Sequence, residues 1–346
     1  MQQTLSHILT EAIHLQASDI HLTIGKPPVL RIHGDLVTFS EDSLKPEDIE
    51  SLVNEVLPAN MKKQLEENRE LDLSYGIPGV ARFRINVYYQ RSHLSMAIRV
   101  IPTEISNLEE LGMPAVLRKI AEKKQGLVLV TGPTGSGKST TLAAMIKHIN
   151  QHLKKHIITL EDPIEYLHKH NHSIIDQREV GFDTKTFAAG LRSALRQDPD
   201  VILVGEMRDL ETISTAITAA ETGHLVLGTL HTSSAAATIE RIVDVFDSNQ
   251  QSQIRIQLAS VLSAIISQRL MPTADRQGRK AATEILLNNH AVANLIRNEK
   301  THQIESVMQT SKAEGMHTLE MSIRQMLKLG TISHDEARPY LQERGM

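Results

Sequence analysis

The first hundred residues alternate between helical and strand-like spacings of apolar side chains. Apolar residues between positions 5 and 15 recur every three or four residues, which predicts an amphipathic helix, and a second helix is expected over 46–67 with a break at Pro58. Runs that are alternating or rich in β-branched residues predict strands at 19–24, 29–32, 71–75, 81–89 and 94–100, with turns at 25–28, 76–79 and 90–92. We therefore expect an N-terminal α+β domain, residues 1–100, built on an antiparallel sheet.

From residue 114 the pattern changes to short apolar runs that alternate with helical segments, which is typical of a parallel sheet in an α/β domain. Residues 101–113 are predicted to form a linker. After about residue 250 the strand signals thin out, and residues 254–270 and 292–328 have helical spacing around a turn at 275–278. We expect one second domain, residues 114–346, with a helical C-terminal region from about residue 250.

Composition narrows the classes of function. The chain has 346 residues, a formal net charge of −4 and 3% aromatic residues, so dense positive charge and stacking platforms for nucleic acid are both lacking and no direct nucleic-acid binding is expected. The absence of Cys excludes disulfides and thiolate zinc sites. No apolar run approaches the roughly 18 residues of a membrane helix, and residues 1–16 do not resemble a signal peptide, so a cytoplasmic protein is expected.

Residues 132–139 match the phosphate-binding loop pattern G-x-x-x-x-G-K-[ST] without interruption. An apolar strand over 126–130 precedes the loop, and a helix over 140–150 follows it. In such a loop, backbone N–H groups bind phosphates, Lys138 meets the β and γ oxygens, and the Ser139 hydroxyl binds Mg²⁺. The sequence thus predicts an ATP and Mg²⁺ site whose phosphate-binding residues are Pro133, Thr134, Gly135, Ser136, Gly137, Lys138, Ser139 and Thr140.

A second strand ends in a carboxylate. Four apolar residues, 201–204, form a predicted buried strand, and Glu206 follows its C-terminal end, where α/β sheets bind ligands. Gly205 stands where many phosphate-loop proteins have a metal-binding Asp, so Glu206 is expected to support the metal or its water, together with Ser139, without that partner. The alternative is a surface Glu at the end of a strand.

A further acidic group follows the predicted strand over 157–160. Glu161 and Glu165 belong to this group. Carboxylates crowded near a γ-phosphate repel it unless they hold metal or orient water, so this group indicates hydrolysis. Solvated loop acids are the alternative interpretation.

Histidines flank the predicted strand over 225–230. His224 precedes the strand and His231 follows it. The chain has 17 histidines, so either one, taken alone, is more often structural than catalytic.

Arginines gather on predicted strands of the N-terminal domain. Arg82 and Arg84 lie two residues apart, so they point to one face, and Arg99 lies on a following strand that can pair beside them. Three cations on one face could meet a phosphate. Alternatively, they solvate an exposed face or pair with acids such as Asp72.

Together these motifs resemble the secretion ATPase superfamily, which drives type II secretion, type IV pili and DNA uptake or transfer. The resemblance covers nearly the whole chain and rests on the phosphate loop, the acidic box 160–166, the segment 191–209 and the His box 222–232. It implies a PAS-like N-terminal domain and a RecA-like P-loop ATPase domain. It also implies catalytic roles for the acids and histidines, and a homohexameric ring in which the three arginines reach a neighbouring subunit's nucleotide.

Within the superfamily the chain is most similar to the type IV pilus retraction ATPases. The other branches usually carry a further N-terminal domain and often a four-Cys metal module, whereas this chain starts at the PAS-like unit and has no Cys. One motif departs from the branch. Its usual form is Ala-Ile-Arg-Asn-Leu-Ile-Arg-Glu, but residues 291–298 carry Ala293 and Asn298 in place of the first Arg and the final Glu.

The sequence therefore predicts a hexameric, Mg²⁺-dependent ATPase that powers pilus retraction and twitching motility. The resemblance implies a partner in the inner-membrane platform of the pilus machine and a place at the cytoplasmic face of that membrane, reached through partners. The alternatives are a pilus assembly or type II secretion ATPase, a nucleotide-dependent scaffold with little turnover, and, less favoured by charge and aromatic content, a DNA motor.

Overall fold

The computed structural model describes residues 4–32, 34–77, 81–101 and 104–341. It divides into a first unit, Met1–Glu104 with Glu165–Leu167, and a second unit, Ile105–Ile164 with His168–Met346. The division between the units falls within the linker predicted over 101–113. Residues 102–103 of this linker, and residues 78–79 of the turn predicted over 76–79, lie outside the described residues. Each unit has its own sheet and its own hydrophobic core.

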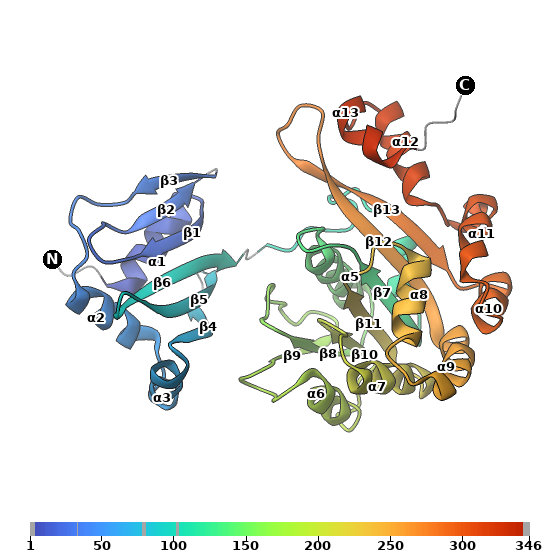
Figure 1. Ribbon diagram of the computed structural model, residues 1–346, viewed down its shortest axis with the longest axis horizontal. Coiled ribbons are helices and arrows are strands. Elements are labelled where there is room, and N and C mark those ends of the chain that lie inside the picture. Colours follow the sequence, from blue (N-terminus) through green and yellow to red (C-terminus); the bar gives the residue numbers. More distant parts are fainter. Residues whose placement is uncertain (1–3, 33, 78–80, 102–103, 342–346) are drawn as a thin grey trace. The chain divides into compact units, whose positions relative to one another are not determined.

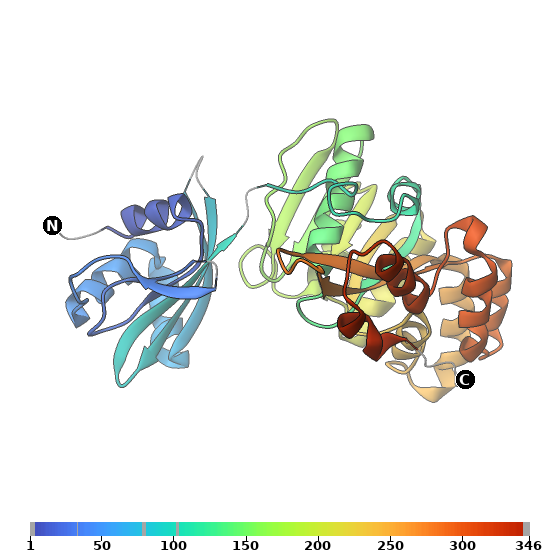
Figure 2. The same ribbon diagram turned by 90° about the horizontal axis from the view of Figure 1, so that it is seen from above.

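The first unit contains a six-stranded antiparallel sheet, in the order β3-β2-β1-β6-β5-β4 (Figure 1). Figure 2 shows the same unit from above. All five predicted strands are confirmed, and β3 was not predicted. The four residues of β3 are all exposed, so they show no apolar alternation, and only pairing with β2 makes them an edge strand. The strands are β1 Ala17–Leu22, β2 Val29–Ile32, β3 Asp35–Thr38, β4 Glu70–Ile77, β5 Ala81–Gln90 and β6 His93–Ile101.

The described residues of the first unit also form three helices: α1 Leu5–His14, α2 Pro46–Val56 and α3 Ala59–Asn68. The break predicted at Pro58 separates α2 from α3.

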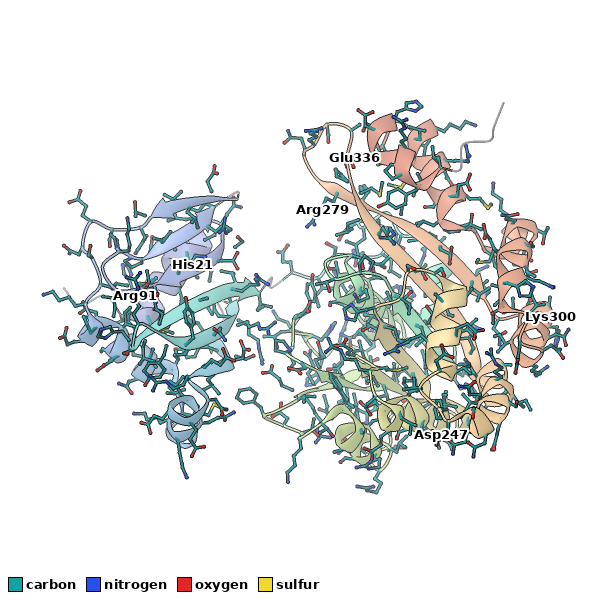
Figure 3. The ribbon with its side chains drawn as sticks, in the orientation of Figure 1. His21, Arg91, Asp247, Arg279, Lys300 and Glu336 are labelled. Carbon is teal, nitrogen blue, oxygen red and sulfur yellow. The ribbon has the colours of Figure 1, made fainter. Side chains whose placement is uncertain are left out.

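The burial pattern of β5 explains on which face its arginines lie. Its alternate residues Phe83, Ile85 and Val87 are buried in the core. The residues between them therefore lie on the other face. Arg91 lies in the β5–β6 turn, as expected (Figure 3).

The second unit contains a seven-stranded sheet in the order β13-β12-β7-β11-β10-β8-β9, parallel except for β13 (Figure 1). Buried residues of β7 alternate between two cores: Leu127 and Leu129 belong to one, Val128 and Val130 to the other. Helices must therefore cover both faces, as the βα pattern predicted. The strands are β7 Gly126–Thr131, β8 His156–Glu161, β9 Ile174–Glu179, β10 Val201–Val204, β11 Leu225–Leu230, β12 Leu262–Pro272 and β13 Arg279–Leu287.

Helices α4 and α5 contribute residues to the hydrophobic core that contains Val128. Helices α6 to α10 contribute residues to the core on the other face of the sheet, which contains Leu127. None of the helices in the described part of the chain has the length and apolar character that crossing a bilayer requires. The helices are α4 Val116–Ala121, α5 Lys138–His152, α6 Phe187–Ala194, α7 Leu210–Glu221, α8 Ala235–Val243, α9 Ser248–Val261, α10 His290–Arg297, α11 Ile304–Thr310, α12 Leu319–Lys328 and α13 His334–Ala337, with 3₁₀ turns at Thr301–Gln303, Lys312–Glu314 and Arg338–Tyr340.

The predicted helix over 254–270 is wrong in its second half, so the region after residue 250 is not purely helical. Helix α9 ends at Val261, and β12 then enters the sheet parallel to β7. Ile265 and Ile266 face opposite cores, so the run is apolar on both faces and lacks a strand's alternation. The predicted turn at 275–278 joins β12 to β13 in a long hairpin, with α12 and α13 packed on it (Figures 1 and 3).

Candidate active site

The phosphate-binding loop joins the end of β7 to the start of α5 at the carboxyl edge of the parallel strands. Gly132 and Gly137 have φ values of +146° and +86°, which L side chains rarely adopt. A Cβ on Gly132 would also lie 2.4 Å from the carbonyl oxygen of Gln268. The loop can therefore take this shape only with glycine at these positions.

The Lys138 ammonium lies inside the loop. The residue is 9% exposed, and its Nζ donates to the carbonyl oxygens of Gly132, at 2.9 Å, and Pro133, at 3.1 Å. The Ser136 hydroxyl is also buried and has no hydrogen-bond partner among the described residues. A buried cation and an orphaned hydroxyl on one glycine-shaped loop fit the oxygens of a phosphate group.

The other predicted loop residues are more accessible. Pro133, Thr134 and Gly135 are exposed at the tip, while Ser139 and Thr140 are half-buried in the first turn of α5. The hydroxyl of Ser139 is thus placed at the helix amino end, where the partial positive charge of the helix favours anions.

Glu206 follows β10 at the same edge of the sheet, and the structure brings His231 to it from the end of the adjacent strand β11. The Nε2 atom of His231 lies 2.9 Å from Oε1 of Glu206, and the Arg208 guanidinium contacts the same oxygen. Glu206 is therefore a held carboxylate, which argues against the alternative of a free surface Glu.

Gly205 lacks a side chain for a packing reason. A Cβ there would lie 3.0 Å from the carbonyl oxygen of Leu160 on β8 and 3.3 Å from the Cα of Glu161. The close approach of β8 thus disfavours the Asp that many phosphate-loop proteins carry at this position.

Glu161 ends β8, beside β10 in the sheet. Its Oε1 accepts hydrogen bonds from the Thr159 hydroxyl, at 2.6 Å, and from Nε2 of Gln177 on β9, at 3.1 Å. Neither partner was predicted from the sequence, although Thr159 lies two residues away on the same face of the strand. The predicted strand-end acid is thus positioned by its neighbours.

The structure does not gather all the predicted residues. Glu165 is exposed, and the segment to which it belongs, Glu165–Leu167, is part of the first unit. His224 precedes β11, so it stands at the opposite end of that strand from His231, and its Nδ1 lies 2.9 Å from the carbonyl oxygen of Ala219. The catalytic roles of Glu165 and His224 stay predictions.

The first unit displays its arginines on one sheet face. Arg84 and Arg99 are directly opposite in the β5–β6 register, and both side chains are exposed. Arg84 lies 3.7 Å from Asp72, as the alternative interpretation expected, and Arg99 lies 3.0 Å from Asp19. Arg82, half-buried, lies two residues before Arg84 on the same strand.

A shallow hollow of about 240 Å³ lies between these charges, lined by Asp19, His21, Asp72, Arg84, Asn86, Ala97, Ile98 and Arg99. Burial alone would raise the pKa of the Asp19 carboxyl, but hydrogen bonds from Arg99 and Ser18 outweigh it and the pKa is lowered. Asp19 therefore stays ionised and holds the Arg99 guanidinium in place.

A charged cluster of the second unit joins α8, α9 and the 3₁₀ turn that follows the motif segment 291–298. Arg255, 6% exposed, donates to both carboxylate oxygens of Glu240, at 3.1 and 2.7 Å, and the Thr301 hydroxyl donates to Glu240 at 2.6 Å. Ala293, which replaces the usual Arg, is buried in the core, and Asn298 donates to the carbonyl of its own helix. The departures thus serve packing and helix termination in this chain.

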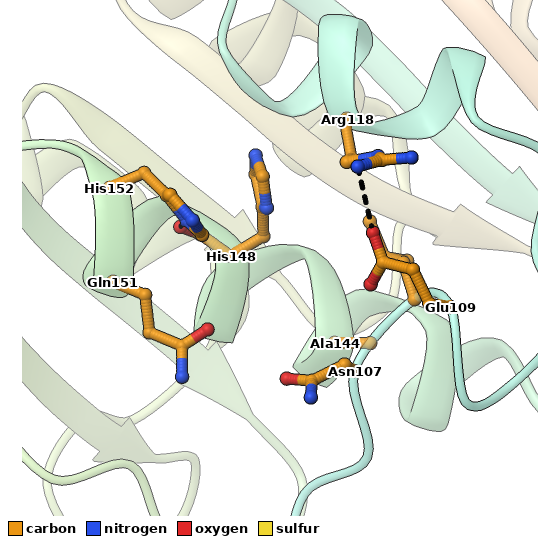
Figure 4. Close-up of a pocket in the computed structure, with 8 residues that line it drawn as sticks. Asn107, Glu109, Arg118, Ala144, His148, Gln151 and His152 are labelled. Carbon is orange, nitrogen blue, oxygen red and sulfur yellow. Dashed lines mark hydrogen bonds and ion pairs between the residues drawn. The ribbon is translucent and has the colours of Figure 1, made fainter.

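A separate hollow of about 200 Å³ lies against the second half of α5 (Figure 4). Arg118 and Glu109 pair at 3.1 Å beside it, and the rings of His148 and His152 stack 4.3 Å apart. Its lining includes none of the predicted phosphate-binding residues, so it is distinct from the loop.

Known proteins resemble this chain along most of its length. The family model of the type II/IV secretion system protein matches residues 1–338. The twitching motility protein of Neisseria gonorrhoeae is 48% identical over 330 residues, which cover 94% of this chain and 88% of that protein. The type IV pilus retraction ATPase PilT of Pseudomonas aeruginosa is 46% identical over 334 residues, which cover 96% of this chain and 97% of PilT.

A solved structure agrees with these relatives. The crystal structure of the pilus retraction motor PilT with bound ADP aligns with a TM-score of 0.93 and 50% identity, over 99% of this chain and 98% of that one. The mixed α/β fold with two sheets is thus confirmed. Since the family model spans nearly the whole chain and relatives of similar length share almost half of its residues, the chain belongs to the type II/IV secretion system protein family, in the branch of the pilus retraction ATPases that its motifs predicted.

Proposed function

We propose that this chain is an ATP hydrolase that powers the retraction of type IV pili and hence twitching motility. One observation carries the proposal: the phosphate-binding loop and two held carboxylates, Glu206 and Glu161, follow parallel strands at one edge of the sheet in a chain of the retraction branch. Hydrolysis needs this combination of phosphate binding and water activation.

The loop supplies the binding. Backbone N–H groups and the Lys138 ammonium neutralise the charge on the phosphates, and Lys138 exchanges its loop carbonyls for phosphate oxygens when nucleotide enters.

The metal site uses few protein groups. Within the described residues no cluster of three or more His, Asp or Glu could by itself hold an ion. A Mg²⁺ ion in nucleotide sites is held largely by phosphates and waters, so the Ser139 hydroxyl with support from Glu206 fits its needs. When bound, Mg²⁺ neutralises charge that develops between the β- and γ-phosphates.

Glu206 and Glu161 share the remaining chemistry. Each carboxylate can accept a proton from water, and each is oriented by neighbours, Glu206 by His231 and Glu161 by Thr159. An oriented carboxylate loses less entropy on reaching the transition state, so the partners contribute to rate without touching nucleotide.

The motor is a homohexameric ring. In this proposal the first unit is a PAS-like domain and the second a RecA-like domain, and Arg82, Arg84 and Arg99 reach the nucleotide of a neighbouring subunit. The exposed side chains of Arg84 and Arg99 support this role. The ring works at the cytoplasmic face of the inner membrane, through the platform protein of the pilus machine.

The test is a deletion strain. A retraction motor opposes assembly, so the strain should display as many pili as wild type or more and should lose twitching movement, and wild-type protein but not Lys138→Ala should restore it. Pilus counts and motility are measured together. A bald strain would show an assembly ATPase instead, and retraction without measurable steady-state turnover in vitro would favour a scaffold.

A further inference from the structure

The side chain of Gln268 is buried between the phosphate-binding loop and α5. Gln268 lies on β12, one residue beyond the pairing of Ser267 with Thr131, and is 2% exposed. Its Nε2 donates to the Ser136 carbonyl at 2.7 Å, and its Oε1 accepts from the Thr141 hydroxyl at 3.0 Å. Both partners belong to the loop or to the helix that follows it.

These contacts determine which way the amide faces. A backbone carbonyl can only accept, so the amide nitrogen must point at Ser136, and the hydroxyl of Thr141 then donates to the amide oxygen. The rest of Gln268 also touches the loop. A Cβ on Gly137 would lie 3.2 Å from Nε2, just as one on Gly132 would meet the Gln268 carbonyl oxygen.

The bond to Ser136 orients the next peptide group. In a planar trans peptide the N–H points opposite to the C=O, so holding the Ser136 carbonyl toward β12 turns the Gly137 N–H away from β12 and into the loop. Backbone N–H groups of such a loop are the donors that cradle phosphates.

We propose that Gln268 is a positioning residue for ATP, which aims the Gly137 N–H at the phosphates. The inference rests on the ATPase activity proposed above. Glutamine meets the requirement because one side chain must donate to a carbonyl and accept from a hydroxyl. A glutamate keeps the shape of the side chain, but its carboxylate cannot donate to the Ser136 carbonyl. A methionine has neither the hydrogen-bond donor nor the acceptor.

Steady-state ATP hydrolysis by the full-length protein tests this role. Gln268→Met should lower kcat/KM for ATP about 10- to 100-fold, mainly through KM, because the phosphate contact exists in both the bound and the transition state. Ser267→Ala is the matched control, since it removes a buried 2.8 Å hydrogen bond to Thr131 on the same strand, and it should stay within about two-fold of wild type.

Gln268→Glu adds a signature that a merely structural role would not give. At pH 8 its carboxylate faces the Ser136 carbonyl without a proton, whereas burial raises the carboxyl pKa, so acidification to pH 6 restores an O–H donor. The defect in kcat/KM relative to wild type should shrink at least about five-fold from pH 8 to pH 6, while that of Gln268→Met stays constant. Equal pH profiles for the two variants, or a Gln268→Met variant with wild-type KM, would overturn the proposal.

Thr141→Val keeps the proposal testable if the Gln268 variants do not fold. It removes the hydroxyl that orients the Gln268 amide, so as a single substitution it should raise KM for ATP about 2- to 10-fold. Combined with Gln268→Met, it should raise KM no further than Gln268→Met alone. A Thr141→Val variant with unchanged KM, or one that costs equally in both backgrounds, would contradict the coupling. A wild-type protein without turnover would contradict the proposed function itself, which separates the two failures.

Discussion

The imidazole Nε2 of His231 lies 2.9 Å from a carboxylate oxygen of Glu206 because β10 and β11 are parallel neighbours in a register that places Val204 opposite Gly228, so the residues that follow the two strands meet. We expect Glu206→Gln to bind nucleotide as wild type does but to hydrolyse it about 10²- to 10⁴-fold more slowly, since the amide keeps the shape and cannot accept the proton of water. Turnover and the binding of ADP should be measured on the same preparation. Wild-type turnover in this variant would show that Glu206 is not part of the catalytic centre.

Lys138→Ala should lower ATP hydrolysis by at least about 100-fold, because the ammonium neutralises charge on the β- and γ-phosphates. The fold should persist, since the contacts of Nζ with the carbonyls of Gly132 and Pro133 lie within its own loop. A thermal melt distinguishes a loss of chemistry from a loss of structure. Unchanged turnover with an intact melt would contradict the assignment of the loop.

Glu161→Gln should be similarly defective if this carboxylate polarises the attacking water, and Thr159→Val should lose about ten-fold because it releases the hydrogen bond that holds Glu161. Comparison of the rates of Glu161→Gln and Glu206→Gln ranks the two carboxylates. Were both variants to hydrolyse ATP like wild type, the catalytic centre would lie elsewhere.

Catalysis should be shared between subunits. An arginine supplied by a neighbour contributes about 10³- to 10⁵-fold in rate, so Arg99→Ala should be severely impaired, and mixing it with Glu206→Gln should recover activity as each subunit completes the other's site. Asp19→Asn is the matched control, because it breaks the ion pair but keeps the arginine side chain itself, which can still reach a phosphate. Co-assembled rings that never recover activity, or a control as impaired as Arg99→Ala, would argue for a structural role.

Glu240→Gln should destabilise the second unit by about 1–3 kcal/mol at pH 7, since the buried Arg255 guanidinium loses its bidentate partner. Arg255 lowers the pKa of the Glu240 carboxyl from 4.5, so this stabilisation is complete above pH 4.5 and is lost as the pH falls through the lower folded value. The melting temperatures of the wild type and of Glu240→Gln should therefore converge as the pH falls from 7 to 3.5. A difference in melting temperature that stays constant with pH would contradict the charge-based explanation.

Local features of this protein were readable from the sequence alone. The phosphate-binding loop depends on glycines, a lysine and a serine within eight consecutive residues, and its strand and helix adjoin it. The same holds for the break at Pro58 and for the strands whose apolar residues alternate. Each of these is determined by backbone geometry and side chains within a few positions, which a pattern in the sequence records directly.

Only the tertiary structure decided what depends on strand order. The short run 264–266 is apolar throughout, which suits a buried helix or a buried strand equally, and its place beside β7 comes from packing over more than a hundred residues of chain. That placement brought Gln268 to the loop, as the β10–β11 pairing brought His231 to Glu206 and left His224 at the other edge. Contacts between distant segments depend on which strands share an edge, and the free energy that selects the order is distributed over the whole core rather than encoded in any one motif.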